Sequence, residues 1–289
     1  MVNTTTAGRD MQPSEIELER RRYRAGAQRK SVLISITSTL VLLAAVVVVL
    51  LNSPGWEVVR QSFLNLEVAR TSLPHVLEGL WLNLRVLFFA VIGVAIFASL
   101  LAYIRTLRNP VFTPLRLFAR GYVDLIRGVP VLVLLYLIGY GIPGLGIVPR
   151  LPAAVWGTIA IIVCYTAYVA EVLRSGIEAV HPSQRIAARS LGLSHGKTLR
   201  LVVMPQAVRK VTPALMNDFV SMQKDVGLIS VLGAVDAVRM AQIDVAQVYN
   251  FTPYVVAGLC FVVLALPFLY ITEHLNKKAQ QREQIGGVV

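Results

Sequence analysis

The sequence predicts an all-α polytopic membrane protein with about six transmembrane helices, because it combines long apolar windows, few charges and an uneven placement of cations. Charged residues make up 15% of the 289 residues, against roughly 25% in globular domains. A bilayer core of ~30 Å requires about 20 apolar residues in a helix. Five windows of about that length contain no Asp, Glu, Lys or Arg: residues 32–51, 86–104, 128–149, 151–170 and 251–272. So many uncharged runs favour membrane spans over the buried helices of a soluble core.

The sixth span is predicted from the distribution of Lys and Arg. Residues 211–235 are long enough to cross the membrane, although Asp218, Lys224 and Asp225 interrupt them. If they cross, 22 of the 28 Lys and Arg residues fall on one side, four on the other and two within spans. Lys and Arg accumulate on the cytoplasmic side, so we expect both termini in the cytoplasm of a bacterial cell. Topology thus accounts for the net charge of +12, which does not indicate nucleic-acid binding.

The segments before residue 79 are expected to lie outside the main bundle. Residues 1–31 form a basic cytoplasmic tail whose first 15 residues are polar and expected to be disordered. Its arginines precede the helix at 32–51 and are expected to meet anionic lipid head groups. No small-residue cleavage site follows that helix, so it is predicted to be retained. Residues 52–78 face outward, and one helical face within them predicts a helix in the outer interface: Trp56, Val59, Phe63 and Leu66.

A long cytoplasmic gap at residues 174–210 carries two short helix signals. The first runs from Pro182, a favoured first helical residue, to Gly192, a favoured terminator. The second starts at Ser194 and is expected to stop near Pro205. Such a pair could dock a soluble partner, and periodicity alone leaves open whether it only lies on the membrane surface.

The chain is not expected to be an enzyme or to bind a cofactor. Gly192 to Thr198 superficially resemble a phosphate-binding P-loop, but only three residues separate the glycines and no strand precedes them. Cys164 and Cys260 lie in apolar runs and form no CxxC. No His cluster or nucleophile–base arrangement is present, so any ATP that drives transport should be bound by another subunit.

The cytoplasmic gap resembles the EAA motif of ABC importer permeases, whose usual form is Glu-Ala-Ala, three residues, Gly, nine residues and Ile-x-Leu-Pro. The matching residues are Ala187-Ala188, Gly192 and Val202-x-Met204-Pro205. Flanking segments resemble those of polar amino acid permeases: Arg127-Gly128-Val129-Pro130, Tyr168-x-Ala170-Glu171-x-x-Arg174-Ser175-Gly176-Ile177 and Gln223-Lys224-Asp225. The resemblance covers roughly residues 76–280.

The resemblance implies a type I ABC importer. In such transporters two permease subunits, identical or related, pair in the membrane. Two ATPase subunits dock on the EAA helices, and an extracytoplasmic binding protein delivers a small solute, here a polar amino acid or a similar molecule. The family core has five spans, placed here at residues 79–273, which makes the helix at 32–51 an addition and residues 274–289 a cytoplasmic tail. The implied ATPase-coupling residues are Ile186, Ala187, Ala188, Arg189, Leu191, Gly192 and Pro205. Ile186 stands where the motif has Glu, so that glutamate's polar contact is not carried over.

The fifth span has a polar stripe. At ~100° per residue, its five polar residues share an arc of ~120°: Asn217, Asp218, Ser221, Lys224 and Asp225. Ionisable groups inside a membrane usually serve function, so we expect the stripe to line the solute path. The carboxylates would meet an ammonium group and the lysine a carboxylate. The alternative is that these charges pair with neighbouring helices and hold the permease dimer together.

The sequence favours a permease over two other classes of membrane protein. An ion-coupled secondary transporter should show internal repeats with matching broken helices, which the sequence does not, and it would leave the long gap unexplained. A structural membrane protein would not need the polar stripe. Glu171 and Arg174, spaced three apart, are expected to form an ordinary helix-end ion pair rather than a gate. The sequence leaves the solute and the pairing of permeases open.

Overall fold

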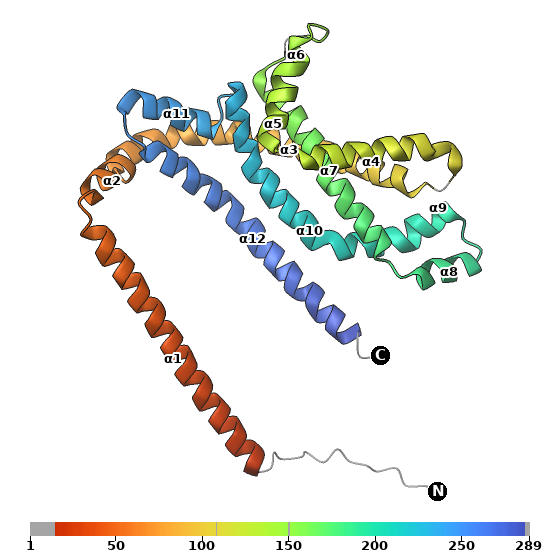
Figure 1. Cartoon of the computed structure of the whole chain (residues 1–289), viewed down its shortest axis with the longest axis horizontal. Coiled ribbons are helices and arrows are strands. Elements are labelled where there is room, and N and C mark those ends of the chain that lie inside the picture. Colours follow the sequence, from red (N-terminus) through yellow and green to blue (C-terminus); the bar gives the residue numbers. More distant parts are fainter. Residues whose placement is uncertain (1–14, 108, 150, 287–289) are drawn as a thin grey trace. The chain divides into compact units, whose positions relative to one another are not determined.

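The computed structural model describes residues 15–107, 109–149 and 151–286, and within these ranges every regular element is helical (Figure 1). Residues 1–14, in which disorder was expected, lie outside the described residues, as do the side chains of Arg20, Arg21, Arg22, Arg24 and Arg29. Four of the described helices are long and apolar enough to cross a membrane, and the number reaches six if two bent pairs each count as one span. The chain forms two units, which meet in sequence between Arg60 and Gln61.

The first unit consists mainly of helix α1 (Glu15–Leu51), whose apolar part runs from Lys30 to Leu51. Leucine and valine side chains are exposed all around this part, as expected for a helix surrounded by lipid. Helix α2 (Trp56–Phe63) follows. Leu66, expected on the same face as Trp56, instead begins the next helix.

Helix α3 (Leu66–Thr106) is the longest of the second unit and is continuous through the expected boundary at residue 79. It starts at Leu66 because the Asn65 side chain accepts hydrogen bonds from the backbone N–H groups of Glu67 and Val68. Small buried residues at every fourth position, Ala90, Val94, Ala98 and Ala102, face helix α7 (Ala153–Glu178). Small side chains let helix backbones approach closely in membranes, so α3 and α7 form the centre of the core.

The helices around residues 128–149, the expected third span, begin and end at other residues than predicted. Helix α4 (Thr113–Gly128), preceded by the short turn η1 (Pro110–Phe112), ends where that span should begin. The chain then bends by 111° into α5 (Val131–Tyr136), the π-helical η2 (Leu137–Gly141) and α6 (Ile142–Gly144). Pro130 causes the break because it cannot donate a helical hydrogen bond and holds Val129 in an extended conformation.

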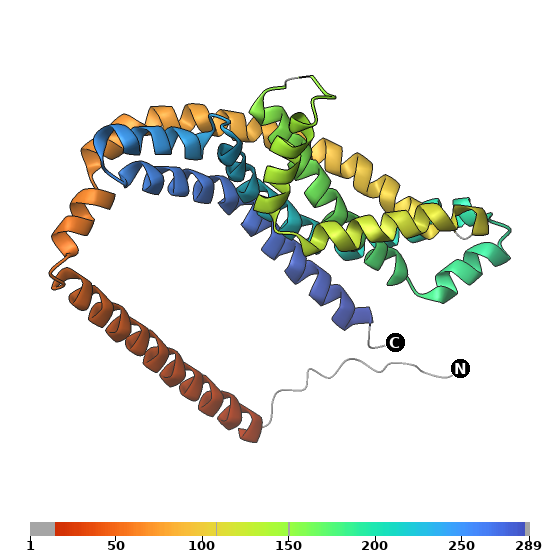
Figure 2. The same ribbon diagram turned by 45° about the horizontal axis from the view of Figure 1, so that its top comes forward.

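The second cytoplasmic helix does not stop near Pro205, contrary to expectation. After α7 and α8 (Pro182–Ser190), one helical rod runs through α9 (His195–Thr198), η3 (Leu199–Val203), α10 (Met204–Asp225) and η4 (Val226–Leu232) (Figure 2). The Met204 N–H donates to the carbonyl of Leu199, five residues back. This π-turn accommodates the proline, which falls in the first turn of α10. The fifth span, expected at 211–235, is therefore the upper part of a rod that begins in the cytoplasmic gap and ends at Leu232.

Two further helices complete the second unit. Helix α11 (Ala237–Val248) follows the rod at an angle of 51°. Helix α12 (Thr252–Gly286) contains the last expected span and continues into the segment expected as a tail. It lies beside α10 in both ribbon views (Figures 1 and 2) and packs on α3, α10 and α11.

Candidate functional site

Helix α8 ends in a geometry that requires glycine. Gly192 has a φ of +81°, its N–H donates to the carbonyl of Arg189 at 2.9 Å, and the N–H of Leu193 donates to Ala188 at 3.2 Å. These two bonds form a Schellman motif, in which the left-handed residue is usually glycine because a Cβ atom is strained there. The motif ends α8 and turns the chain toward α9.

Four of the seven expected coupling residues lie on α8, two follow it directly, and Pro205 lies in the first turn of α10. Two of the seven expose large apolar side chains. Ile186 is 65% exposed and Leu191 83% exposed, whereas Ala188 is buried. The remaining members are exposed: Ala187, Arg189, Gly192 and Pro205. Large apolar side chains that are exposed on a short helix and at its end are typical of a surface that another protein covers.

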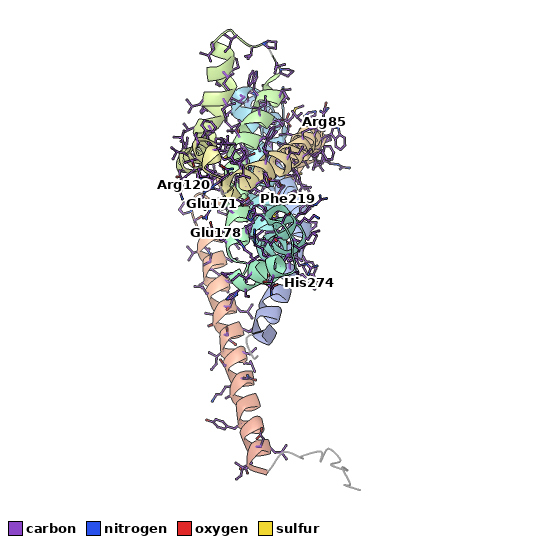
Figure 3. The ribbon with its side chains drawn as sticks, turned by 90° about the vertical axis from the view of Figure 1, so that its right-hand side faces the viewer. Arg85, Arg120, Glu171, Glu178, Phe219 and His274 are labelled. Carbon is purple, nitrogen blue, oxygen red and sulfur yellow. The ribbon has the colours of Figure 1, made fainter. Side chains whose placement is uncertain are left out.

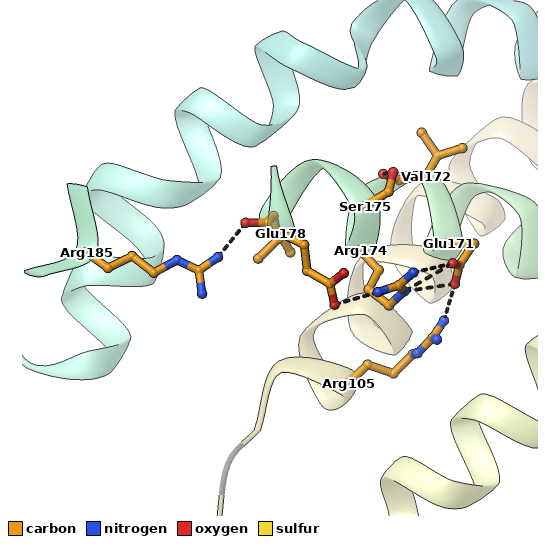
Figure 4. Close-up of polar contacts among 8 residues, drawn as sticks. Arg105, Glu171, Val172, Arg174, Ser175, Glu178 and Arg185 are labelled. Atoms are coloured by element: carbon orange, nitrogen blue, oxygen red, sulfur yellow. Dashed lines mark hydrogen bonds and ion pairs between the residues drawn. The ribbon is translucent and has the colours of Figure 1, made fainter. Parts of the chain in front are cut away.

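Polar and apolar contacts hold this segment to the rest of the molecule. The Arg185 guanidinium donates to the carbonyl of Ile177 (Figure 4), and the Lys210 ammonium donates to the carbonyl of Ala179 at 2.7 Å. A small buried cluster lies under them: Ile177, Val180, Val203 and Ala207. The end of α7 thus packs against the beginning of the helical rod, next to the start of α8.

An ionic cluster lies at the same end of α7. Arg174 donates to Glu171 at 2.6 Å and pairs with Glu178 at 2.5 Å, while Arg105 from the end of α3 donates to Glu171 at 2.7 Å (Figure 4). The expected pair of Glu171 and Arg174 is present, and the structure adds Arg105. That third partner is 66 residues away in sequence, so no local pattern could have indicated it.

The polar stripe of α10 lies at the surface of the single chain. Asn217, Ser221 and Lys224 are exposed, and Asp218 and Asp225 are partly buried. On the opposite side of the helix, three residues are buried in the core: Val220, Met222 and Gln223. The five expected path residues therefore share one face, which is open to a solute path or to another subunit.

The two carboxylates of the stripe differ in their contacts. The Tyr165 hydroxyl of α7 donates to Asp225 at 2.8 Å. One oxygen of Asp218 is buried and has no hydrogen-bond partner among the described residues. Tyr165 was not singled out by the sequence, because its contact with Asp225 joins residues 60 positions apart.

A buried polar network that the sequence analysis missed joins α3 to the start of α11. The Asn83 amide nitrogen donates to the carboxylate of Asp236 at 2.9 Å and to the carbonyl of Val226 at 3.0 Å, and its oxygen accepts from the N–H of Ala237. Gly79 lies so close that a Cβ atom there would meet the Asp236 backbone at 2.4 Å. A lone asparagine inside an apolar run was the one available signal.

Replacing Asn83 by alanine should lower the free energy of unfolding by about 2–4 kcal/mol, because one oxygen of the buried Asp236 carboxylate and the carbonyl of Val226 then lose their donor. Thermal unfolding of the purified chain would measure this effect. Asn217→Ala, at an exposed position, is the matched control and should leave the melting temperature unchanged. Equal melting temperatures for the two variants would show that the network does not stabilise the fold.

Comparison with known proteins gives consistent matches. Residues 95–281 match the family model of the binding-protein-dependent transport system inner membrane component. The chain is 30% identical over 226 residues to the arginine transport system permease protein ArtQ of Bacillus subtilis, covering 76% of this chain and all of that protein. It is 34% identical over 205 residues to the putative glutamine transport system permease protein GlnP of Rickettsia conorii, covering 70% and 92%.

Solved structures give the same picture. A chain of an amino acid ABC transporter crystallised with histidines superposes with a TM-score of 0.64 at 35% identity, covering 71% of this chain and 94% of that one. A chain of the inward-facing MetNI methionine ABC transporter superposes with a TM-score of 0.53 at 18% identity, covering 71% and 96%. The second likeness shows the fold alone.

Proposed function

The chain belongs to the family of binding-protein-dependent transport system inner membrane components, and from this membership we propose that it is the permease subunit of an ATP-driven importer for a polar amino acid or similar small solute. It is a multi-pass membrane protein of the ABC permease fold. The apolar surface that α8 and its C-cap expose through Ile186 and Leu191 carries the proposal. It offers a separate ATPase subunit a surface next to the helix that bears the polar stripe.

Coupling would use the continuity of the α10 rod. The segment after α8 enters a helix that runs from His195 to Leu232. A displacement at its cytoplasmic end is therefore carried to Asp218 and Asp225 without passing through a loop. ATP would bind and be hydrolysed on the partner subunit, and α8 would be the point at which that subunit moves this one.

The polar stripe would form half of the solute path. A zwitterionic amino acid requires an acceptor for its ammonium group, which Asp225 and Asp218 supply, and a cation for its carboxylate, which Lys224 supplies. The stripe is exposed in the single chain, so a second permease subunit, identical or related, would close the path from the other side. The names of the relatives and of the solved transporter support amino acids as the solute class.

The proposed orientation places α8 and both termini in the cytoplasm, where most Lys and Arg residues then lie. The bend between η4 and α11 would face outward, toward the solute-binding protein. The protein would reside in the bacterial cytoplasmic membrane.

Reconstitution tests the proposed function. The chain is co-expressed with its ATPase subunit, and the purified complex is placed in vesicles with the solute-binding protein. ATP hydrolysis and uptake should both depend on solute-loaded binding protein. Solute accumulation by the isolated chain in vesicles with an ion gradient alone would instead identify a secondary transporter.

A further inference from the structure

A basic pocket of about 320 Å³ lies where the ends of α3 and α7 meet the beginning of α4. Four arginines line it, Arg105, Arg116, Arg120 and Arg174, together with the carboxylate of Glu178. Figure 3 shows Arg120 on α4 on the same side of the molecule as Glu178 on α7. The residues that line this pocket belong neither to the seven expected coupling residues nor to the polar stripe.

The charges that line the pocket do not balance. Arg105 and Arg174 are paired with the carboxylates of Glu171 and Glu178. Among the described residues, Arg116 donates only to neutral oxygens, the carbonyl of Leu107 at 2.6 Å and the hydroxyl of Thr113 at 2.7 Å. Arg120 is exposed, and in the described part of the chain no hydrogen bond or ion pair occupies it. The guanidinium groups of Arg116 and Arg120 therefore line the pocket without a carboxylate to balance their charge.

Exposed apolar side chains and an apolar groove lie next to the pocket. Leu117 lines the pocket and is 69% exposed, and the adjacent Phe118 is 73% exposed. On the other side of α4, Phe118 borders an apolar groove of about 480 Å³ between α3, α4 and α7. That groove extends along α3 to Ile104, the residue before Arg105. The two hollows flank the same helix, one cationic and one apolar.

We propose that this pocket binds the phosphate of an anionic phospholipid, with Arg116 and Arg120 as its ligands and the lipid's hydrocarbon lying along the apolar surface of α4. A guanidinium group can bind a phosphate through two parallel N–H···O hydrogen bonds. Basic pockets between transmembrane helices on the cytoplasmic side bind anionic head groups. A free phosphate would leave Leu117 and Phe118 uncovered. The inference rests on the proposed orientation, which puts this end of α3 and α7 at the cytoplasmic leaflet, and not on the identity of the solute.

Equilibrium binding of fluorescent phosphatidylglycerol to the purified full-length chain in detergent tests the proposal. The wild-type chain should prefer phosphatidylglycerol to phosphatidylcholine with the same acyl chains. Arg120→Gln should weaken phosphatidylglycerol binding about fivefold, and Arg116→Gln/Arg120→Gln about thirtyfold, at about fivefold for each arginine. Arg120 makes no hydrogen bond or ion pair within the described residues, so its single variant stays informative if the double variant folds poorly.

The matched control is Arg200→Gln/Arg209→Gln, which removes two exposed cations from the helical rod that contains α10 and should leave lipid binding unchanged. Three results would overturn the proposal: equal binding by wild type and Arg120→Gln, an equal loss in the control, or displacement of the lipid by millimolar inorganic phosphate. Unchanged lipid binding with loss of ATPase binding in Arg120→Gln would assign the pocket to a protein partner instead. These measurements need neither ATP nor solute, so their failure is separate from a failure of transport.

Discussion

Replacing Asp225 by asparagine should reduce solute uptake at least tenfold while the transporter still assembles. Asp225 lies on the open face of α10, and its carboxylate is held by the Tyr165 hydroxyl at 2.8 Å. A hydrogen bond to a charged group contributes about 1.5–3 kcal/mol, which corresponds to a factor of roughly ten to one hundred and fifty in solute binding. Uptake of labelled solute into vesicles and size-exclusion chromatography of the complex are the two measurements.

Two companion variants make this result specific. Tyr165→Phe removes the hydroxyl that orients the carboxylate but keeps the charge that would meet the solute, so it should reduce uptake less than Asp225→Asn does. Glu273→Gln neutralises an exposed carboxylate on α12 and should have no effect. If Asp225→Asn transports normally, the stripe does not line the path. If the complex instead falls apart, Asp225 holds subunits together, which is the alternative role for these charges.

Leu191→Asp should weaken binding of the ATPase subunit about thirtyfold. Leu191 is 83% exposed at the end of α8, and burying a leucine side chain contributes about 2 kcal/mol. A charge at this position would also have to lose its water when the partner covers it. Pull-down of the ATPase subunit by the purified permease, titrated over concentration, measures the change.

The control for this prediction uses the same chemical change at another surface. Val248 is half exposed at the end of α11, far along the chain from α8, and Val248→Asp should leave ATPase binding intact. Ile186→Glu restores the acid that the EAA motif usually has and tests whether the partner's surface is apolar, in which case affinity falls. ATPase binding by Leu191→Asp equal to that of wild type would exclude α8 as the docking helix.

Much of the architecture could be read from the sequence, because it depends on local composition. The thickness of the bilayer sets the length of the apolar windows. The difference between the two sides of a membrane sets where Lys and Arg residues accumulate. The end of α8 at Gly192 depends on one residue's backbone freedom. The stripe on α10 follows from helical periodicity alone, and its members do share a face. Each of these features involves residues within a few turns of one another.

Sequence-based prediction was wrong about which prolines interrupt a helix, because that depends on the residues around each proline. Pro130 breaks a span and Pro205 does not, although both are prolines within apolar surroundings. At Pro130 the chain changes direction by 111°. Near Pro205 a π-turn keeps the helix continuous. Local propensity treats the two alike, and only the packing of the flanking segments distinguishes them.

The sequence by itself determined that the chain spans a membrane and which helix carries charge, and it indicated the segment that we propose as the docking site of a soluble partner. Only the tertiary structure decided which side chains meet: Asn83 with Asp236, Arg105 with Glu171, and Tyr165 with Asp225, separated by 153, 66 and 60 residues. The physical reason is that hydropathy and periodicity act within single helices. A hydrogen bond between helices depends on their crossing angle and register, which are set by the packing of small residues along α3 and α7.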